Sequence, residues 1–313
     1  MLKILVTGAS GFVGKSLITK LIWHGYSVCA AVRSIKSQIN NAEVVVVGEI
    51  DGNTIWANAL RDVDVVIHLA ARVHVMNERA TIPLDEFREV NVEGTKRLAV
   101  LAASVGVKRF VYVSSVKVNG EQTDLSPYTE LDIPNPQDPY GVSKWEAEQA
   151  LHKISAQTNL EVVIVRSPLV YGAEVKGNFA QMKIVLAKGI PLPLAAVRNL
   201  RSLVYIENLV DALILCSTHP NAAGKTYLVS DGEDVSTVEL LRQVGEAMGQ
   251  PARLFSCSPI LLKLAGRLIG KSEQLDRLLG SLQVDSSKIR KELGWVPAVS
   301  FAEGIKKTVE GLV

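Results

Sequence analysis

The chain of 313 residues is poor in cysteine, in excess charge of either sign and in long apolar runs. Its three cysteines, Cys29, Cys216 and Cys257, lie far apart, lack metal-ligand spacing and have apolar neighbours. This predicts buried thiols, a reducing compartment and no structural metal. A formal net charge of +2, without a run of Lys or Arg, leaves no electrostatic footprint for a nucleic-acid backbone. We therefore expect no nucleic-acid partner.

Features of secreted and membrane-spanning proteins are also missing. Met1 leads directly into a strand-like run at 3–7, without the basic start and cleavage site of a signal peptide. No stretch of about 18 apolar residues could cross a bilayer. We therefore expect a cytoplasmic protein without a transmembrane segment. Residues 258–270 are apolar and mildly basic, which is compatible with peripheral membrane contact but more typical of a core helix.

What the sequence does contain is a large apolar fraction, 48%, with 21% charged residues, as in an enzyme-sized globular protein. Its first half alternates β-branched runs with helix-period segments, which is typical of βαβ units on a parallel sheet. Continuous apolar runs predict strands covered on both faces. We predict strands at 3–8, 27–33, 43–49, 63–71, 109–115 and 160–167, and helices at 12–24, 53–61, 86–105 and 141–156.

Glycine and proline interrupt the chain after Ser167, and helical patterns dominate from about residue 236. The predicted fold class is α/β, a doubly wound parallel (Rossmann) sheet with a smaller, mostly helical C-terminal substrate domain. We expect the dinucleotide-binding domain to comprise residues 1–172 and about 203–230. The substrate-binding domain would comprise residues 173–202 and 231–313.

The glycine-rich segment TGASGFVG (7–14) follows the first predicted strand and opens the first helix, as a dinucleotide-binding loop does. Gly8 permits the tight turn, Gly11 lets the backbone approach a pyrophosphate, and Gly14 lets helix and strand pack closely. The helix N-terminus offers N–H groups to the phosphates. The alternative is a glycine-rich turn without a ligand. The predicted cofactor contacts in this segment are Gly8, Ser10, Gly11, Phe12, Val13 and Gly14.

The residue after the second strand indicates which cofactor fits. An acidic residue there would bind the ribose 2′-hydroxyl of NAD, whereas an arginine accommodates the 2′-phosphate of NADP. Arg33, followed by Ser34, therefore favours NADP, with NAD as the alternative if Arg33 is only a solvated surface cation. Glu49 follows the third strand and is expected near the adenine, unless it is simply an exposed strand-end carboxylate.

Three residues form a candidate catalytic set. Tyr140 and Lys144 lie four residues apart and share one face of a predicted helix, where an ammonium can lower the pKa of the phenol. Ser115 ends a predicted strand at the carboxyl edge of the sheet, where ligands of such folds bind. Its hydroxyl could hydrogen-bond a substrate carbonyl or alkoxide.

The segments TGASGFVG, HLAA (68–71), NVEGT (91–95), VSSVKVNG (113–120), YGVSK (140–144) and ELGW (292–295) resemble the extended short-chain dehydrogenase/reductase family. The similarity covers nearly the whole chain and points to its NAD-dependent epimerase/dehydratase branch, which acts mainly on nucleotide-diphosphate sugars. The resemblance implies a Ser/Tyr/Lys triad at Ser115, Tyr140 and Lys144, with Asn91 helping to seat it. It also implies a homodimer through helices 86–105 and 141–156. Implied cofactor contacts further along the chain are Arg33, Ser34, Glu49, Ile50, Leu69, Ala70, Ala71, Tyr140 and Lys144.

The resemblance also implies substrate contacts. Arg201 falls where the family places an arginine on the substrate diphosphate, a role that suits its planar fork, although it could be a surface charge. Asn178 and Arg277 are weaker candidates for nucleotide contact. Ser115 would bind the sugar. Lys117 would face a substrate phosphate or polar group, or be a solvated loop lysine.

The residues after Ser115 separate the reactions open to this family. Its dehydratases carry an Asp-Glu pair there, whereas this chain has Val116 and Lys117, so dehydration is not expected. Because Arg33 favours NADPH, the sequence favours a UDP-4-keto-hexose C4 reductase. The stretches LAARVHVMNE (69–78) and SSVKVNGE (114–121) resemble such reductases, of UDP-4-keto-6-deoxy-N-acetylglucosamine, from bacterial surface-polysaccharide synthesis.

Two other functions remain open. The first is a UDP-sugar 4-epimerase, of the UDP-glucose or UDP-N-acetylglucosamine type. The second is a non-catalytic NADP-sensing Rossmann protein. The complete triad disfavours a sensor.

Overall fold

The computed structural model describes residues 1–34, 39, 41–73, 83–175, 178–268, 270 and 272–311. A seven-stranded parallel sheet forms its centre, with the strand order β3-β2-β1-β4-β5-β6-β9. The order reverses between β1 and β4, as in doubly wound dinucleotide-binding folds. The predicted fold class is confirmed. The strands are β1 (Lys3–Thr7), β2 (Ser27–Val32), β3 (Glu43–Val46), β4 (Val65–His68), β5 (Arg109–Ser115), β6 (Glu161–Ser167) and β9 (Thr226–Leu228).

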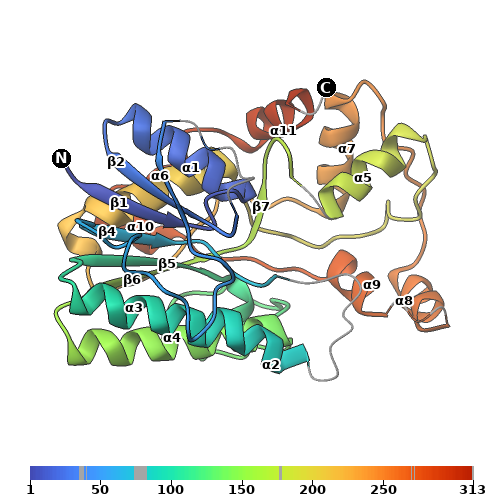
Figure 1. Ribbon diagram of the computed structural model, residues 1–313. Coiled ribbons are helices and arrows are strands. Elements are labelled where there is room, and N and C mark those ends of the chain that lie inside the picture. Colours follow the sequence, from blue (N-terminus) through green and yellow to red (C-terminus); the bar gives the residue numbers. More distant parts are fainter. Residues whose placement is uncertain are drawn as a thin grey trace.

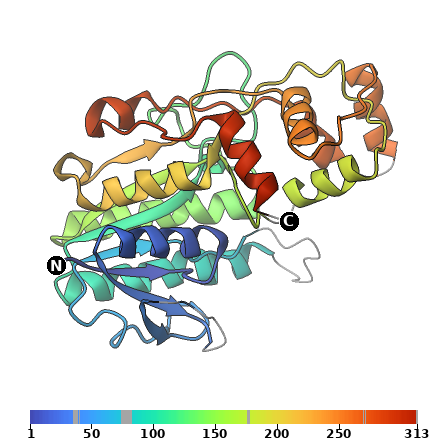
Figure 2. The same ribbon diagram turned by 90° about the horizontal axis from the view of Figure 1, so that it is seen from above.

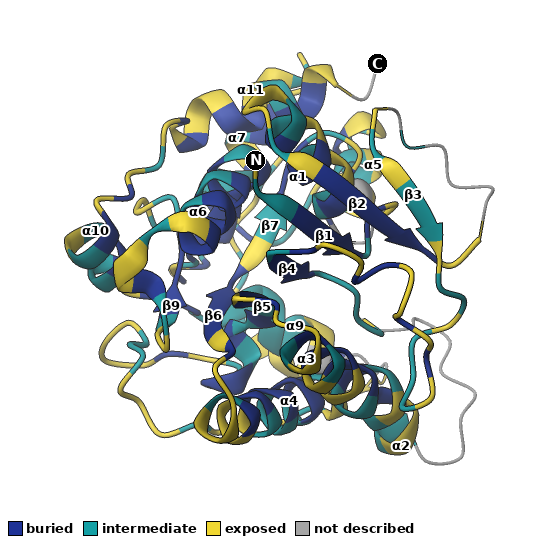
Figure 3. Cartoon of the chain, turned by 60° about the vertical axis from the view of Figure 1, so that its left-hand side comes forward, coloured by how far each residue is buried: buried dark blue, intermediate teal, exposed yellow. Residues whose placement is uncertain are grey.

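Helices cover both faces of this sheet (Figure 1). Alternate residues of each strand enter two separate cores: Ile4 and Val6 of β1 face one, and Leu5 faces the other. The central strands are buried along most of their length (Figure 3), as their continuous apolar runs predicted. On the first face lie α1 (Phe12–Trp23), α6 (Ile206–Thr218) and α10 (Ser287–Leu293), and on the second α3 (Thr95–Ser104) and α4 (Pro139–Gln157).

Two predicted helices differ from the structure. Residues 53–61 form turns, because the Thr54 hydroxyl donates to the carbonyl of Glu49 (3.0 Å) and the Asp51 carboxylate accepts from the Asn53 N–H (2.7 Å). Such local side-chain bonds compete with helix formation. Residues 86–105 are helical but not uniform, since the π-helix η1 (Glu89–Gly94) separates α2 (Pro83–Arg88) from α3.

A smaller lobe lies beyond the carboxyl edge of the sheet (Figures 1 and 2). Its core contains the aromatic group of Tyr171, Phe179, Tyr205 and Phe301. Residues 287–295 fall in the range predicted for the substrate-binding domain, but they pack on the core of the large sheet.

Among the described residues, no helix combines the length and apolar character needed to cross a bilayer. The lobe contains β7 (Leu169–Tyr171), β8 (Leu203–Tyr205), α5 (Asn178–Ala187), α7 (Thr237–Ala247), α8 (Pro259–Leu268), α9 (Ser272–Leu279) and α11 (Phe301–Glu310). The short helices η2 (Val116–Val118) and η3 (Pro220–Ala222) complete the chain.

A buried ion pair joins β5, β6 and α4. Arg166 on β6 donates two hydrogen bonds to the Glu148 carboxylate on α4, at 3.0 and 2.6 Å. The side chains of Arg166 and Glu148 are 5% and 0% exposed. Ser114 on β5 donates to the same carboxylate at 2.5 Å, and Arg166 also donates to the Asn119 side-chain oxygen at 3.1 Å. Every charged atom of the pair therefore has a partner, which is what makes a buried charge tolerable.

Removing one member would leave the other as an uncompensated buried charge. We expect Arg166→Met to lower the free energy of unfolding by about 3–5 kcal/mol. Lys96→Met is the matched control, because Lys96 pairs with Glu93 at 3.3 Å on the surface, and it should change stability by less than about 0.5 kcal/mol. Urea unfolding of both variants measures the difference. Equal stabilities would show that the buried pair contributes nothing.

Candidate active site

The loop between β1 and α1 packs too closely for side chains. Gly8 has a φ of +65°, and a Cβ there would lie 2.9 Å from the backbone nitrogen of Ala70. A Cβ on Gly14 would lie 2.3 Å from the Gly8 carbonyl oxygen. No side chain caps the first turn of α1, whose N-cap is Gly11, so its N–H groups are available to an anion. This cradle fits a dinucleotide pyrophosphate.

The buried His68 holds residues 68–71 next to the glycine-rich loop. The His68 ring lies 2.6 Å from the Thr7 hydroxyl and 2.9 Å from the Thr95 hydroxyl, and Thr7 also accepts from the Ala70 N–H at 3.2 Å. Burial lowers the pKa of His68 to about 3, with the charge of Lys144 adding to the effect. His68 is therefore a neutral spacer between β1, β4 and α3. Leu69, Ala70 and Ala71 follow it directly, at the carboxyl edge of β4.

Arg33 and Glu49 lie together at the ends of β2 and β3. Their charged groups are 3.7 Å apart, and both side chains are largely exposed. Ser34 is also exposed, while Ile50 lies against Gly94, where a Cβ would come within 2.6 Å of its side chain. Arg33, the residue predicted to select the cofactor, thus has Glu49 as an acidic neighbour. Their separation in the sequence does not reveal this contact.

Ser115, Tyr140 and Lys144 come from adjacent elements. Ser115 ends β5, and its hydroxyl oxygen accepts from the Lys117 N–H at 3.2 Å. Tyr140 and Lys144 occupy the first turns of α4, which begins after the N-cap residue Asp138; the Asp138 carboxylate accepts from the Gly141 N–H at 2.6 Å. Since α4 packs against β5, the three residues gather at the carboxyl edge of the sheet.

Asn91 ties the start of α4 to the segment after β4. Its side-chain amide donates to the Ser143 hydroxyl at 2.9 Å and to the Arg72 carbonyl at 3.0 Å, and its oxygen accepts from the Arg72 N–H at 2.8 Å. Ser143 lies between Tyr140 and Lys144 and donates to the Tyr140 carbonyl at 2.8 Å. These bonds hold the backbone that carries both residues.

The two titratable groups of the set have pKa values shifted against their charged forms. Lys144 is buried, with its ammonium 4.1 Å from the centre of the Tyr112 ring, and burial lowers its pKa to about 7 although the Glu148 carboxylate opposes this. Burial raises the pKa of Tyr140 to about 12, and the Asp138 carboxylate adds to the increase. The Lys144 ammonium faces the Tyr112 ring, and burial dominates the pKa of Tyr140, so the lowering of that pKa by Lys144 stays a prediction.

The candidate substrate residues Lys117, Arg201 and Arg277 gather between the two lobes. The Lys117 ammonium contacts the carboxylates of Glu121, at 2.9 Å, and Asp138. The Arg277 guanidinium lies 3.9 Å from each of these carboxylates. Arg201 donates to the carbonyls of Arg277 (2.7 Å) and Gly280 (3.1 Å).

Lys117 is therefore a paired, partly buried lysine, and its contact with substrate stays a prediction. Its ammonium is paired because η2 turns it toward the N-cap of α4. Asn178 begins α5, but its side chain lies outside the described residues, as do residues 74–78 of the stretch 69–78.

Sequence reasoning missed four residues of this site: Tyr112, Glu121, Asp138 and Glu148. Only Asp138 carries a recognisable signal, because Asp followed by Pro at the first helical position is typical of a helix start. Glu121 lies only four residues after its partner Lys117, but an acidic residue in a loop is not by itself a signal of a site. Tyr112 and Glu148 contact side chains on other elements, which no local pattern identifies.

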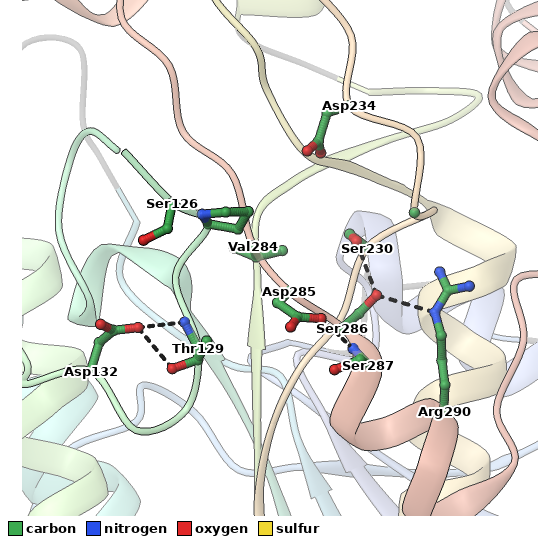
Figure 4. Close-up of a pocket in the computed structure, with 12 residues that line it drawn as sticks. Ser126, Thr129, Asp132, Ser230, Asp234, Val284, Asp285, Ser286, Ser287 and Arg290 are labelled. Atoms are coloured by element: carbon green, nitrogen blue, oxygen red, sulfur yellow. Dashed lines mark hydrogen bonds between the residues drawn. The ribbon is translucent and has the colours of Figure 1, made fainter. Parts of the chain in front are cut away.

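A separate pocket of about 470 Å³ contains none of the predicted site residues (Figure 4). Its carboxylates are already engaged: Asp132 accepts from Thr129, Asp234 from Ser202 and Gln283, and Asp285 from the Ser287 N–H. We assign no ligand to it. Among the described residues, no group of three His, Cys, Asp or Glu side chains is arranged to hold a metal ion.

A doubly wound sheet with a phosphate-binding glycine loop and a Ser/Tyr/Lys set at its carboxyl edge defines a dinucleotide-dependent oxidoreductase fold. Residues 4–230 match the model of the NAD dependent epimerase/dehydratase family. The chain belongs to this family, and it is an NAD-dependent enzyme of the extended short-chain dehydrogenase/reductase type.

Individual relatives cover the whole chain. A "UDP-glucose 4-epimerase" of Vibrio cholerae is 44% identical over 313 residues, which is 99% of this chain and 95% of the relative. A 4-epimerase of N-acetyl-alpha-D-glucosaminyl-diphospho-ditrans,octacis-undecaprenol from Escherichia coli O157:H7 is 25% identical, covering 98% and 94%. The crystal structure of UDP-glucose 4-epimerase with UDP-glucose from Thermotoga maritima, 24% identical, shares the fold with a TM-score of 0.80, covering 99% and 98%.

The contact between Lys144 and the Tyr112 ring predicts a specific pH effect. A cation over an aromatic face is stabilised by about 0.5–2 kcal/mol, which corresponds to about 0.4–1.5 pKa units. Replacing Tyr112 by Leu removes this stabilisation, so Lys144 should lose its proton at lower pH. We expect the basic limb of the pH profile of kcat/KM to move down by about 0.4–1.5 pH units.

Tyr112→Phe is the matched control, because it keeps the aromatic face and should leave the basic limb in place. Thermal melts of both variants separate this effect from the loss of packing. A basic limb that moves equally in Tyr112→Phe, or in neither variant, would contradict the role of the ring.

Proposed function

We propose that this protein is a UDP-sugar 4-epimerase of the UDP-glucose or UDP-N-acetylglucosamine type. The observation that carries the proposal is the Ser115, Tyr140 and Lys144 set, gathered at the cofactor edge with Val116 and Lys117 in place of the Asp-Glu pair of dehydratases. The names of the 44% and 25% identical relatives both specify epimerisation at C4. They support the epimerase better than the C4 reductase that Arg33 led us to expect.

The loop at Gly8, Gly11 and Gly14 would hold the dinucleotide through the N-terminus of α1. When bound, its nicotinamide accepts a hydride from a carbon that bears a hydroxyl group and can return it. Tyr140 would take the proton of the C4 hydroxyl as that carbon is oxidised. It would return the proton after the keto sugar has rotated in the site and presented its opposite face to the nicotinamide. Ser115 would hydrogen-bond the same sugar oxygen.

The raised pKa of Tyr140 gives Lys144 its function in this scheme. A phenol with a pKa of about 12 is a poor base near neutral pH, so the phenolate requires a positive charge close to it. A protonated Lys144 would provide this charge and would also bind the cofactor ribose. Arg201 and Arg277 would bind the substrate diphosphate, since both guanidinium groups lie where the two lobes meet.

A homodimer through α3 and α4 belongs to the same proposal. It rests on the resemblance to the family and on Val100 of α3, an apolar side chain that is 45% exposed.

Tyr140→Phe tests the chemistry. Removing the hydroxyl that moves the proton should lower kcat for the interconversion of UDP-glucose and UDP-galactose, or of their N-acetyl forms, by about 10²–10⁴-fold. Binding of NADH, followed by the fluorescence of its reduced nicotinamide, should be almost unchanged. Wild-type-like turnover in this variant would refute the assignment.

Arg33 supports a second candidate, the C4 reductase of a UDP-4-keto sugar that consumes NADPH. An arginine after β2 suits a 2′-phosphate, and Arg33 is exposed to receive one. The dinucleotide that co-purifies distinguishes the two functions. Retained NAD supports the epimerase, because its hydride is recycled, whereas an empty site that NADPH saturates supports the reductase.

Arg33→Asp sharpens the comparison. If Arg33 binds a 2′-phosphate, this variant should weaken NADPH binding by about tenfold or more and leave NAD binding unchanged or tighter. Lys96→Asp, a change of the same charge on exposed α3, is the control. Unchanged NADPH affinity in Arg33→Asp would remove the support for the reductase.

A further inference from the structure

Helix α8 exposes apolar side chains to solvent on the side facing away from its own lobe. Ile260, Leu261, Leu264 and Leu268 are 78%, 59%, 54% and 81% exposed. On a helical projection these four residues span about 100° of the surface. The opposite side is also apolar, since Leu262 is buried and a Cβ on Gly266 would lie 2.3 Å from the Leu275 side chain of α9. Packing against the lobe therefore accounts for only one side of α8.

Basic side chains flank the exposed apolar stripe. Lys263 and Arg267 lie one turn apart along its edge, and both are exposed. They line a pocket of about 290 Å³ together with Gln122, Ser272 and Asp276. Residues 259–268 contain no acidic residue, and the contact of Lys263 with Asp276 is 3.4 Å long. The exposed face of α8 is thus apolar with a basic border.

This pattern favours an anionic lipid surface over the other occupants. A helix with large apolar residues and Lys or Arg beside them binds at the headgroup boundary, where both components are satisfied. A symmetric contact with a second copy would bring the Lys263 and Arg267 edges of two chains near one another, and like charges oppose it. In Figures 1 and 2, α8 lies at the far end of the small lobe from the N-terminal strands, so a flat surface can reach it.

We propose that the exposed face of α8 (Ile260, Leu261, Leu264 and Leu268, bordered by Lys263 and Arg267) docks this protein on anionic membranes. The apolar side chains would enter the boundary between headgroups and acyl chains, and the two basic residues would contact lipid phosphates. The docking does not require the proposed epimerase activity. It would place the substrate end of the site near the bilayer, because Gln122 of the adjoining pocket neighbours Glu121, the partner of Lys117.

Sedimentation with vesicles tests the proposal with the full chain. We expect the wild type to sediment with vesicles of mixed phosphatidylglycerol and phosphatidylcholine at low salt, and much less with phosphatidylcholine alone or at high salt. Ile260→Asp should weaken binding by about tenfold or more. Ile55→Asp is the matched control, because Ile55 is also 78% exposed but lies in the turn after β3, and it should bind like the wild type.

Arg267→Glu should weaken binding to the mixed vesicles by about fivefold or more for the charge lost at the surface. Thermal melts should show that Ile260→Asp remains folded, as expected for an exposed position. Failure of the wild type to sediment would overturn the proposal, as would equal binding of Ile260→Asp and Ile55→Asp. A dimer that dissociates in Ile260→Asp without vesicles would identify the face as a contact between copies instead.

Discussion

The ion pair between Arg166 and Glu148 is the constraint on which the geometry of the site depends. Burying both charges is unfavourable, and this desolvation free energy is offset only while Arg166 and Ser114 keep their hydrogen bonds to the Glu148 carboxylate. Those bonds fix β5, β6 and α4 relative to one another. Ser115 follows Ser114 on β5, and Lys144 lies one turn before Glu148 on α4, so the same pair determines where both functional side chains lie.

The electrostatics of the site indicate a protein prepared for a charged ligand. Without one, burial disfavours the ammonium of Lys144 and the phenolate of Tyr140, and it keeps His68 neutral. Around Lys117 the charged forms are instead stabilised, because Glu121 and Asp138 already balance the charges of Lys117 and Arg277. A bound diphosphate would therefore compete with carboxylates of the protein, whereas a cofactor would enter a region where burial keeps Tyr140 neutral and disfavours the charge of Lys144.

The sequence predicted most of the sheet and the local parts of the site. Continuous apolar runs identified the strands, and the glycine spacing identified a loop in which Gly8 and Gly14 have no room for a Cβ. The helix predicted at 53–61 does not form, because Asp51 and Thr54 bond to nearby backbone groups and so compete with helical bonding. Glu148 and Tyr112 could not be predicted, since their partners lie on other elements and no local spacing encodes such pairings.

The choice between NAD and NADP reduces to a competition at the end of β2. Arg33 is paired with Glu49 at 3.7 Å, but such an exposed pair contributes only about 0–1 kcal/mol. A 2′-phosphate can accept two N–H groups of the same guanidinium and carries more charge, so it would displace Glu49 readily. NAD lacks this 2′-phosphate, so Glu49 would remain beside Arg33 as a carboxylate able to accept hydrogen bonds from ribose hydroxyls. The same two residues therefore suit either cofactor, and the relative affinity depends on how much of the phosphate charge Glu49 offsets.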